Sequence, residues 1–238
     1  MRLSVVVPTL NEAPRIETRL RALRDEGALH ELLVVDGGSD DGTVERATPL
    51  AERVLEESGG LARQLNRGVA AATGDVVFFP YADTVLPANW YASIERAVED
   101  PKVVGGGFRL GFDSDRWPYR LIAATANLRS ALGWGPLGDQ ALFARREVAA
   151  DVGFREEVLL EDLDFVRRLR HAGRVRVLPA PVATSVRRWE HGGIAVTTLR
   201  NWAYLARHIL GTRSDRTRQE YRRFRVEGRP SGSVSDGA

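Results

Sequence analysis

The first eighty residues alternate short apolar runs with segments of helical pattern, and this alternation limits the fold more than any other feature. Residues 3–7, 32–35 and 75–79 form apolar runs rich in valine, leucine and phenylalanine, which is typical of buried strands. Between the first two runs, Ile16 and Leu20 recur at helical spacing. We therefore expect an α/β fold with a mostly parallel central sheet flanked by helices.

Acidic residues stand where two of these predicted strands end. Asp36 closes the second run, Asp83 follows the third, and Glu161 and Asp162 stand together in a later LLED motif. The C-terminal ends of parallel strands share one edge of a sheet, and open α/β sheets bind ligands there. Carboxylates at this edge suit a metal-assisted reaction on a nucleotide-linked substrate.

Composition excludes several classes of protein. Arginine and lysine together number 34 against 32 acidic residues, and a net charge of +2 gives no reason to expect a nucleic-acid partner. The absence of cysteine excludes disulfides and thiolate metal sites, so the cytoplasm is the default location. The chain starts without the pattern of a signal peptide and has no apolar run long enough to cross a bilayer.

Five motifs in order resemble those of a family 2 glycosyltransferase. They are SVVVPTLNE, VVDGGSDDGT, GLARQLNRGVAAATGD, the ADT after an apolar run, and LLED. The resemblance covers about residues 3–192, and five motifs in order are more specific than any one of them. It implies a GT-A fold, a nucleotide-sugar donor with a UDP-sugar favoured, a divalent metal (Mg²⁺ or Mn²⁺) and inversion at the anomeric carbon.

A subgroup labelled arsenosugar-biosynthesis-type transferases shares two further motifs with the chain. These are GDQALF and a later RRWEHGG, and the label need not state the true substrate. We expect one glycosyltransferase domain over residues 1–210, with a nucleotide-binding half at about 1–100 and an acceptor half at about 101–210. Residues 211–238 are rich in arginine and then in serine and glycine, which predicts a basic, flexible tail.

The resemblance implies that the exits of the first strands bind the donor. Asp36 is expected to accept a hydrogen bond from an imide or amino group at the edge of the base, although such an aspartate also caps turns. For Arg63 the sequence leaves open a contact with the base or diphosphate and a surface ion pair. The predicted donor-binding set is Pro8, Thr9, Asn11, Glu12, Asp36, Gly37, Arg63, Ala82 and Asp83.

Asp83 is the best candidate metal ligand, because Mg²⁺ and Mn²⁺ favour oxygen ligands and a diphosphate supplies more of them. The usual family pattern has two carboxylates flanking one residue, but Tyr81 stands at the first position here. This departure leaves the metal dependence open, as does the alternative that Asp83 forms a turn. His191 is either a second metal ligand or an ordinary surface histidine.

An acceptor hydroxyl needs a base to take its proton, and the resemblance assigns this role to Asp162, with Glu161 orienting it or the acceptor. The alternative is that both acids stabilise the first turn of a helix. Arginine matches phosphate oxygens well, whereas an Asp-Gln pair is equally typical of a turn. Contacts with the acceptor or phosphate are predicted for Asp139, Gln140, Arg187 and Arg188.

Residues 199–210 form an apolar helical stripe beside Arg200 and Arg207. Such a helix usually packs on its own domain, but a peripheral contact with an anionic membrane, at its inner face, also fits. Seven arginines within residues 213–229 would strengthen that contact; a solvated tail or a contact in a homo-oligomer is the more cautious interpretation.

Two other functions stay open. A nucleotidyltransferase shares related architecture, but its Gly-rich phosphate loop with arginine and lysine is absent from the N-terminal region. A non-catalytic nucleotide-binding or scaffold protein is supported by Tyr81 in place of an acid, whereas the presence of Asp162 argues against it.

Overall fold

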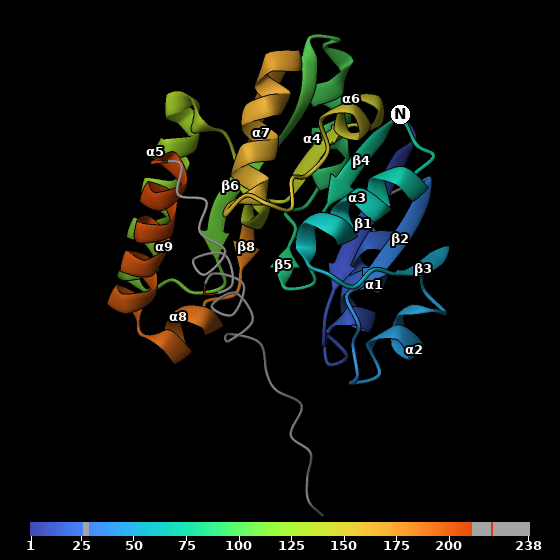
Figure 1. The fold of residues 1–238 in the computed structure, drawn as a ribbon, viewed down its shortest axis with the longest axis horizontal. Coiled ribbons are helices and arrows are strands. Elements are labelled where there is room, and N and C mark those ends of the chain that lie inside the picture. The colour runs from blue at the N-terminus through green and yellow to red at the C-terminus, as the bar shows by residue number, and fades with distance from the viewer. Residues whose placement is uncertain (26–28, 211–219, 221–238) are drawn as a thin grey trace, which may run out of the picture.

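The apolar runs assemble into one mixed sheet with helices on both faces (Figure 1). The computed structural model describes residues 1–25, 29–210 and 220, so the predicted tail lies almost wholly outside the described part. The strands are β1 (Leu3–Thr9), β2 (Glu31–Asp36), β3 (Arg53–Glu56), β4 (Val76–Phe79), β5 (Thr84–Val85), β6 (Val103–Phe112), β7 (Leu142–Arg145) and β8 (Arg174–Thr184).

Most helices connect or follow these strands. The α-helices are α1 (Ile16–Asp25), α2 (Thr43–Ala47), α3 (Leu61–Ala71), α4 (Trp90–Glu99), α5 (Trp117–Arg129), α6 (Arg146–Val152), α7 (Glu161–Ala172), α8 (Arg187–Gly192) and α9 (Ile194–Ile209). A π-helical turn, η1 (Ser130–Trp134), continues α5, and a short 3-10 turn, η2 (Gly138–Gln140), precedes β7. In the described part of the chain, no helix is both long and apolar enough to cross a membrane.

The strand order is β3-β2-β1-β4-β7-β6-β8-β5. The first four strands of that order are parallel, and β6 and β8 are also parallel, whereas β7 is antiparallel to both of its neighbours. The β1–β2 register pairs Thr9 with Asp36, so the two strands end at the same level. The predicted α/β fold with a mostly parallel sheet is confirmed.

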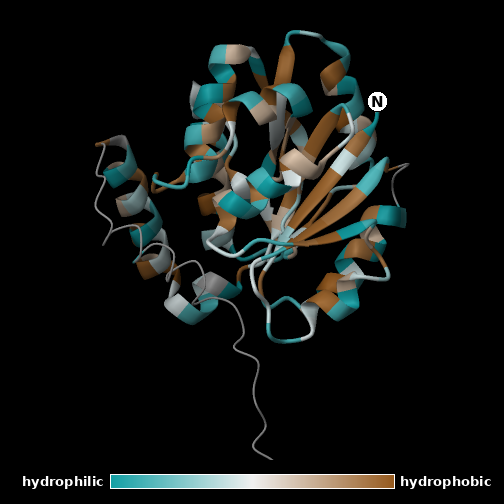
Figure 2. Cartoon of the chain, turned by 45° about the vertical axis from the view of Figure 1, so that its right-hand side comes forward, coloured by the Kyte–Doolittle hydropathy of each residue, from teal (hydrophilic) through white to brown (hydrophobic). Residues whose placement is uncertain are grey.

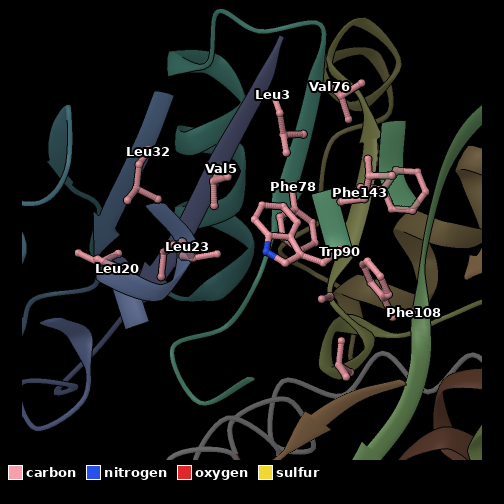
Figure 3. Packing of buried hydrophobic residues seen from close by; sticks show 14 of the residues in the cluster. Leu3, Val5, Leu20, Leu23, Leu32, Val76, Phe78, Trp90, Phe108 and Phe143 are labelled. Atoms are coloured by element: carbon pink, nitrogen blue, oxygen red, sulfur yellow. The ribbon is translucent and has the colours of Figure 1, made fainter. Parts of the chain in front are cut away.

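Alternating residues of β1 divide the core between the two faces of the sheet. Val5 faces a cluster with α1 and α4, in which the Phe78 and Trp90 rings stack with centroids 5.0 Å apart (Figure 3). Val6 faces the opposite cluster, with Leu65 of α3 and residues of α6 and α7. Figure 2 shows the apolar strands of the sheet enclosed by helices that mix polar and apolar residues. Burial on both faces makes the parallel strands continuously apolar.

Local geometry sets the ends of two helices. α4 begins at Trp90, because residues 87–89 form the turn before it. α5 passes into η1, where Gly133 has φ +98°. A left-handed residue of this kind cannot continue a right-handed helix, so the helix ends there.

Candidate active site

A cavity of about 370 Å³ lies at the C-terminal ends of β1, β2 and β4 and reaches across to α5, α7 and α9. This is the sheet edge at which the sequence places the acidic residues. The topology brings together nine of the predicted site residues in its wall: Pro8, Glu12, Gly37, Ala82, Asp83, Asp139, Glu161, Asp162 and Arg187. Their chemical roles stay predictions.

Other predicted site residues are not part of the cavity wall. They are Thr9, Asn11, Asp36, Arg63, Gln140 and His191. The side chain of Arg188 lies outside the described part of the structure.

Asp36 is buried and engaged within the protein. Its Oδ1 accepts hydrogen bonds from the hydroxyls of Thr9 (3.1 Å) and Ser39 (2.5 Å). Its Oδ2 accepts from the backbone N–H groups of Gly38 (2.9 Å) and Ser39 (2.7 Å). Four donors use most of the acceptor capacity of a carboxylate, so the turn-capping alternative accounts for this side chain. A direct contact between Asp36 and a base stays a prediction.

Asn11 and Glu12 join the loop after β1 to the loop after β2. The N–H of Asn11 donates to Ser39 Oγ (2.8 Å), and Asn11 Oδ1 accepts from the N–H of Asp40 (3.1 Å). The N–H of Glu12 donates to Thr43 Oγ1 (2.8 Å). The Glu12 carboxylate is buried in the cavity wall and lies 3.7 Å from the guanidinium of Arg15. These contacts hold the two loops as one rigid wall.

Gln64 of α3 is a wall residue that the sequence analysis missed. Its Nε2 donates to the carbonyls of Thr9 and Val35, both at 2.8 Å, and so joins the ends of β1 and β2. A Cβ on Gly37 would lie 3.0 Å from that nitrogen, which explains why the neighbouring wall position is glycine. Its signal in the sequence is weak: Gln64 is one polar residue on the buried face of an amphipathic helix.

Asp83 lies in the wall near a partly buried cation, Arg19. Arg19 of α1 donates from Nε to the Ala82 carbonyl (3.5 Å), and burial lowers the pKa of Arg19 while the charge of Asp83 partly offsets this effect. The sequence analysis missed Arg19, because nothing in the pattern of α1 distinguishes it from surface arginines. Arg19 provides positive charge next to Asp83.

The residues around Asp83 fit a divalent metal only if the substrate completes the site. Within the described ranges there is no group of three or more His, Cys, Asp or Glu side chains placed to hold an ion. Mg²⁺ is often held by one or two carboxylates together with substrate phosphates, and one carboxylate is what Asp83 offers. His191 is exposed, and its Nδ1 lies 2.9 Å from the Arg187 carbonyl, as expected for the surface alternative.

Asp162 is fixed at the start of α7 and faces the same cavity. Its Oδ2 accepts the N–H of Gly138 (2.8 Å), and its Oδ1 accepts the N–H of Leu163 (2.8 Å). Each oxygen therefore keeps a lone pair, unlike the oxygens of Asp36. A side chain on Gly138 would overlap the Tyr81 hydroxyl and come within 3.0 Å of Asp162 Oδ2. Tyr81 thus packs against the loop that holds Asp162.

Arg129 of α5 is a second partly buried cation that the sequence analysis missed. It lines the cavity, and its Nη2 donates to Gln140 Oε1 at 3.4 Å. Burial lowers the pKa of Arg129, and the nearby charges of Asp139 and Asp162 act in the opposite direction. Its Nη1 is buried and has no hydrogen-bond partner among the described residues. No sequence signal separates Arg129 from other arginines in its helix.

Gln140 and Arg63 take the structural roles that the sequence left open. Gln140 is fully buried, donates to the Phe108 carbonyl (2.8 Å) and accepts from the N–H of Leu137 (3.0 Å), so it shapes the turn. Arg63 forms a half-exposed ion pair with Glu156 at 2.6 Å, and its pKa is raised by that hydrogen bond. Neither side chain reaches the cavity wall.

Residues 4–151 match the family model described as Glycosyl transferase family 2. The chain is 32% identical over 215 residues to the uncharacterized protein MT1568 of Mycobacterium tuberculosis (strain CDC 1551 / Oshkosh), covering 78% of this chain and 66% of that protein. It is 30% identical over 159 residues to glucosyl-3-phosphoglycerate synthase of the same strain, covering 62% of this chain and 47% of the synthase. The chain thus spans only about half to two thirds of the length of these relatives.

Solved structures resemble the fold. A mannosyltransferase from Pyrobaculum calidifontis, in complex with GDP-Man and Mn²⁺, is 26% identical with a TM-score of 0.65, covering 87% of this chain and 61% of that one. The M. tuberculosis glucosyl-3-phosphoglycerate synthase, in complex with Mn²⁺, UDP and glucosyl-3-phosphoglycerate, is 24% identical with a TM-score of 0.56, covering 84% and 79%. The second likeness concerns the fold alone.

Proposed function

The chain belongs to glycosyl transferase family 2, and we propose that it moves a sugar from a nucleotide diphosphate-sugar to an acceptor hydroxyl, with inversion at the anomeric carbon. Its fold is GT-A, as the sequence predicted. One observation carries the proposal: both Asp83, the carboxylate proposed for the diphosphate side, and Asp162, the carboxylate proposed for the acceptor side, lie in the wall of a single cavity. Asp83 follows β4 and Asp162 lies in the first turn of α7, so the two carboxylates come from different elements.

Asp162 is the proposed general base. As the acceptor oxygen attacks the anomeric carbon, the free lone pairs of Asp162 take the hydroxyl proton, and the bond from that carbon to the diphosphate oxygen breaks. The two backbone hydrogen bonds to Asp162 fix the orientation of its carboxylate. A base on one side of the sugar and a leaving group on the other give a single displacement, which inverts the configuration.

Asp83 is proposed to hold a divalent cation jointly with the diphosphate. The cation would supply charge neutralisation for the leaving nucleotide diphosphate. Arg187 lies in the same wall, with its Nε 3.0 Å from Ser185 Oγ, and is placed to donate to phosphate oxygens. Tyr81 packs towards Asp162 instead of standing beside Asp83 as a second acid, so the metal would depend on the nucleotide for most of its ligands.

The finer assignments rest on the sequence. A UDP-sugar is the favoured donor, while the related mannosyltransferase binds GDP-Man, so both bases belong in the test. We assign nucleotide binding to about residues 1–100 and acceptor binding to about 101–210. The GDQALF and RRWEHGG motifs support the arsenosugar-type subgroup, whose label we do not use to name an acceptor. We also propose a cytoplasmic location and no nucleic-acid partner, and we assign no oligomeric state.

The test is calorimetric titration of the full chain with UDP and GDP, each with and without Mn²⁺. We expect selective binding of one nucleotide that Mn²⁺ strengthens at least about tenfold and that Asp83→Asn weakens by a similar factor. Asp151→Asn, an exposed acid of α6 outside the cavity wall, is the matched control and should bind as the parent does.

Other outcomes would select the alternative functions. Nucleotide binding without turnover of any nucleotide-sugar would favour a binding or scaffold protein. Release of pyrophosphate from a nucleoside triphosphate would favour nucleotidyl transfer. Absence of binding to either nucleotide would contradict the glycosyltransferase proposal.

A further inference from the structure

Exposed apolar side chains are concentrated on two helices beside the cavity. Of ten large hydrophobic side chains that are exposed in the described residues, nine lie in α5 and η1 or in and just after α9. The exposed fractions reach 73% for Trp117, 71% for Leu132, 68% for Leu199 and 81% for Leu210. Single exposed apolar residues are ordinary, but a concentration of this kind marks an interaction surface.

The exposed residues form one stripe on each helix. The α9 stripe has the spacing i, i+3, i+7, i+10 and i+14 and consists of Val196, Leu199, Ala203, Ala206 and Leu210. The α5 stripe has the spacing i, i+4, i+7, i+11 and i+15 and consists of Trp117, Leu121, Ala124, Leu128 and Leu132. A surface helix normally turns its apolar stripe to the core, whereas these two stripes face outwards.

The apolar stripe of α9 faces outwards because the opposite face of the helix packs against the protein. Thr197 and Tyr204 are buried on it, and Tyr204 packs with Leu160 and Leu163 at the start of α7. The helix is thus anchored by its other side, and its apolar stripe is left without a partner within the described chain.

The charged residues around the two stripes indicate what kind of surface the stripes contact. Residues 116–138 and 191–210 contain no acidic residue, although the chain has 32. Exposed arginines flank the stripes: Arg116 just before α5 and Arg120 on it, and Arg200 and Arg207 on α9. A second copy of the chain would bring arginines against arginines with no acid in either stripe. The positive charge of the two stripes instead favours contact with an anionic surface.

We propose that the two stripes dock on the surface of an anionic lipid bilayer. Amphipathic helices with apolar and Trp residues on one side and arginines beside them lie in the headgroup region in this way. Trp117, Trp134 and Trp202 are all exposed on these elements, as is typical of side chains at a membrane interface. Both helices also line the cavity, through Ile122 and Trp202 among others, so docking places the cavity beside the bilayer.

Vesicle flotation of the full chain tests the proposal, with phosphatidylcholine vesicles that either contain or lack phosphatidylglycerol. We expect binding only to the anionic vesicles, and weaker binding at high salt. Leu199→Gln should weaken binding by about tenfold or more, because it removes one large apolar contact. Arg200→Gln and Arg207→Gln should each weaken it by about fivefold. Val85→Gln should have no effect, because Val85 is the one exposed large hydrophobic residue of the described chain that lies away from α5, η1 and α9.

These replacements are on the surface, and an unchanged far-ultraviolet circular dichroism spectrum would show that the fold is kept. Equal binding to both vesicle types, or binding to neither, would overturn the proposal. Light scattering would also overturn it if the parent chain formed an oligomer that Leu199→Gln dissociates, because the stripes would then contact a second copy.

Discussion

At the residue scale, the number of hydrogen bonds that each side chain accepts distinguishes two buried carboxylates that look alike in the sequence. Asp36 ends β2 and Asp162 lies in the first turn of α7, and for each of them the sequence offers a chemical role and a structural alternative. In the structure Asp36 accepts four hydrogen bonds within the protein and Asp162 accepts two. Only Asp162 combines free lone pairs with a place in the cavity wall.

This difference predicts opposite effects of the same substitution. Asp162→Asn should lower kcat by about 10²–10⁴-fold, because an amide cannot take the acceptor proton, and should leave nucleotide affinity within about twofold. Asp36→Asn should instead weaken nucleotide binding, because it loosens the loop that carries Gly37. Steady-state kinetics together with nucleotide titration measure both effects. If Asp162→Asn kept most of its turnover, another group would have to be the base.

Arg129 offers a test of whether a positive charge in the cavity wall beside the proposed base contributes to catalysis. Its partly buried guanidinium lies near Asp139 and Asp162, so Arg129→Met removes a positive charge from the wall. We expect kcat to fall by about tenfold or more, with partial recovery in Arg129→Lys, which keeps the charge. Arg120→Met, on the exposed side of the same helix, is the control. An equal loss of kcat in Arg129→Met and Arg129→Lys would indicate that the shape of the side chain matters and its charge does not.

At the element scale, α3 lies unusually close to β1. A Cβ on Gly68 of α3 would overlap the Val6 side chain, and both residues are buried. Ala in place of Gly inside a helix ordinarily stabilises it by about 0.5–1 kcal/mol. Here Gly68→Ala should destabilise the protein by about 1–3 kcal/mol, because overpacking forces the elements apart. Urea unfolding measures this change, with exposed Arg67→Ala as the control; a gain in stability would contradict the packing argument.

Glu31 joins three elements at the start of β2. It accepts hydrogen bonds from Ser4 of β1 (2.6 Å), from Thr73 after α3 (2.5 Å) and from Arg53 of β3 (3.1 Å). Burial by itself raises the pKa of Glu31, but these bonds outweigh it and lower the pKa from 4.5 to about 2.

The lowered pKa predicts where stability is lost. The contribution of Glu31 is present above about pH 4.5 and disappears as the pH falls towards about 2, because the folded state then has to take up a proton against its hydrogen bonds. Glu31→Gln should cost on the order of 2 kcal/mol at pH 7 and flatten the decline of stability in this range. Denaturant unfolding at a series of pH values measures both. Glu17→Gln, in an exposed pair with Arg21, should change neither.

The sequence predicts those strands whose own residues have the apolar pattern of a buried strand. The buried strands β1, β2 and β4 are continuous apolar runs and are easy to recognise. β8 is different: it alternates exposed and less exposed residues, and it includes Pro179 and Pro181 where its register with β6 shifts. Proline cannot donate to a strand partner and is tolerated at such an irregularity, so β8 depends on its neighbours more than on its own residues.

At the scale of the whole molecule, the site residues are of two kinds: a sequence motif marks some of them, and tertiary packing alone brings in the others. Asp83 and Asp162 are predictable, because a motif marks each and the sheet edge brings them together. Gln64, Arg19 and Arg129 belong to three helices, and only tertiary packing carries their side chains to or beside the cavity. A buried arginine and a surface arginine have the same appearance in sequence, so these cations emerge only from the structure.

Because the cavity wall combines residues from both halves of the chain, such as Pro8 and Asp162, a ligand that needs this wall binds the folded state alone. At 100 times its Kd such a ligand stabilises the protein by about 2.7 kcal/mol, which for a chain of this size raises Tm by roughly 5–10 °C.

We expect UDP or GDP to produce this rise in Tm only together with Mn²⁺, because Asp83 alone offers the ion too few ligands and the diphosphate alone lacks its counter-charge. Thermal scans of the parent chain with nucleotide, with Mn²⁺, with both, and with both plus EDTA separate the contributions. Asp83→Asn should lose the joint effect and Asp151→Asn should keep it. If EDTA left the nucleotide-induced rise intact, the positive charge opposite the diphosphate would have to come from arginines such as Arg187, and Asp83 would have a role other than metal binding.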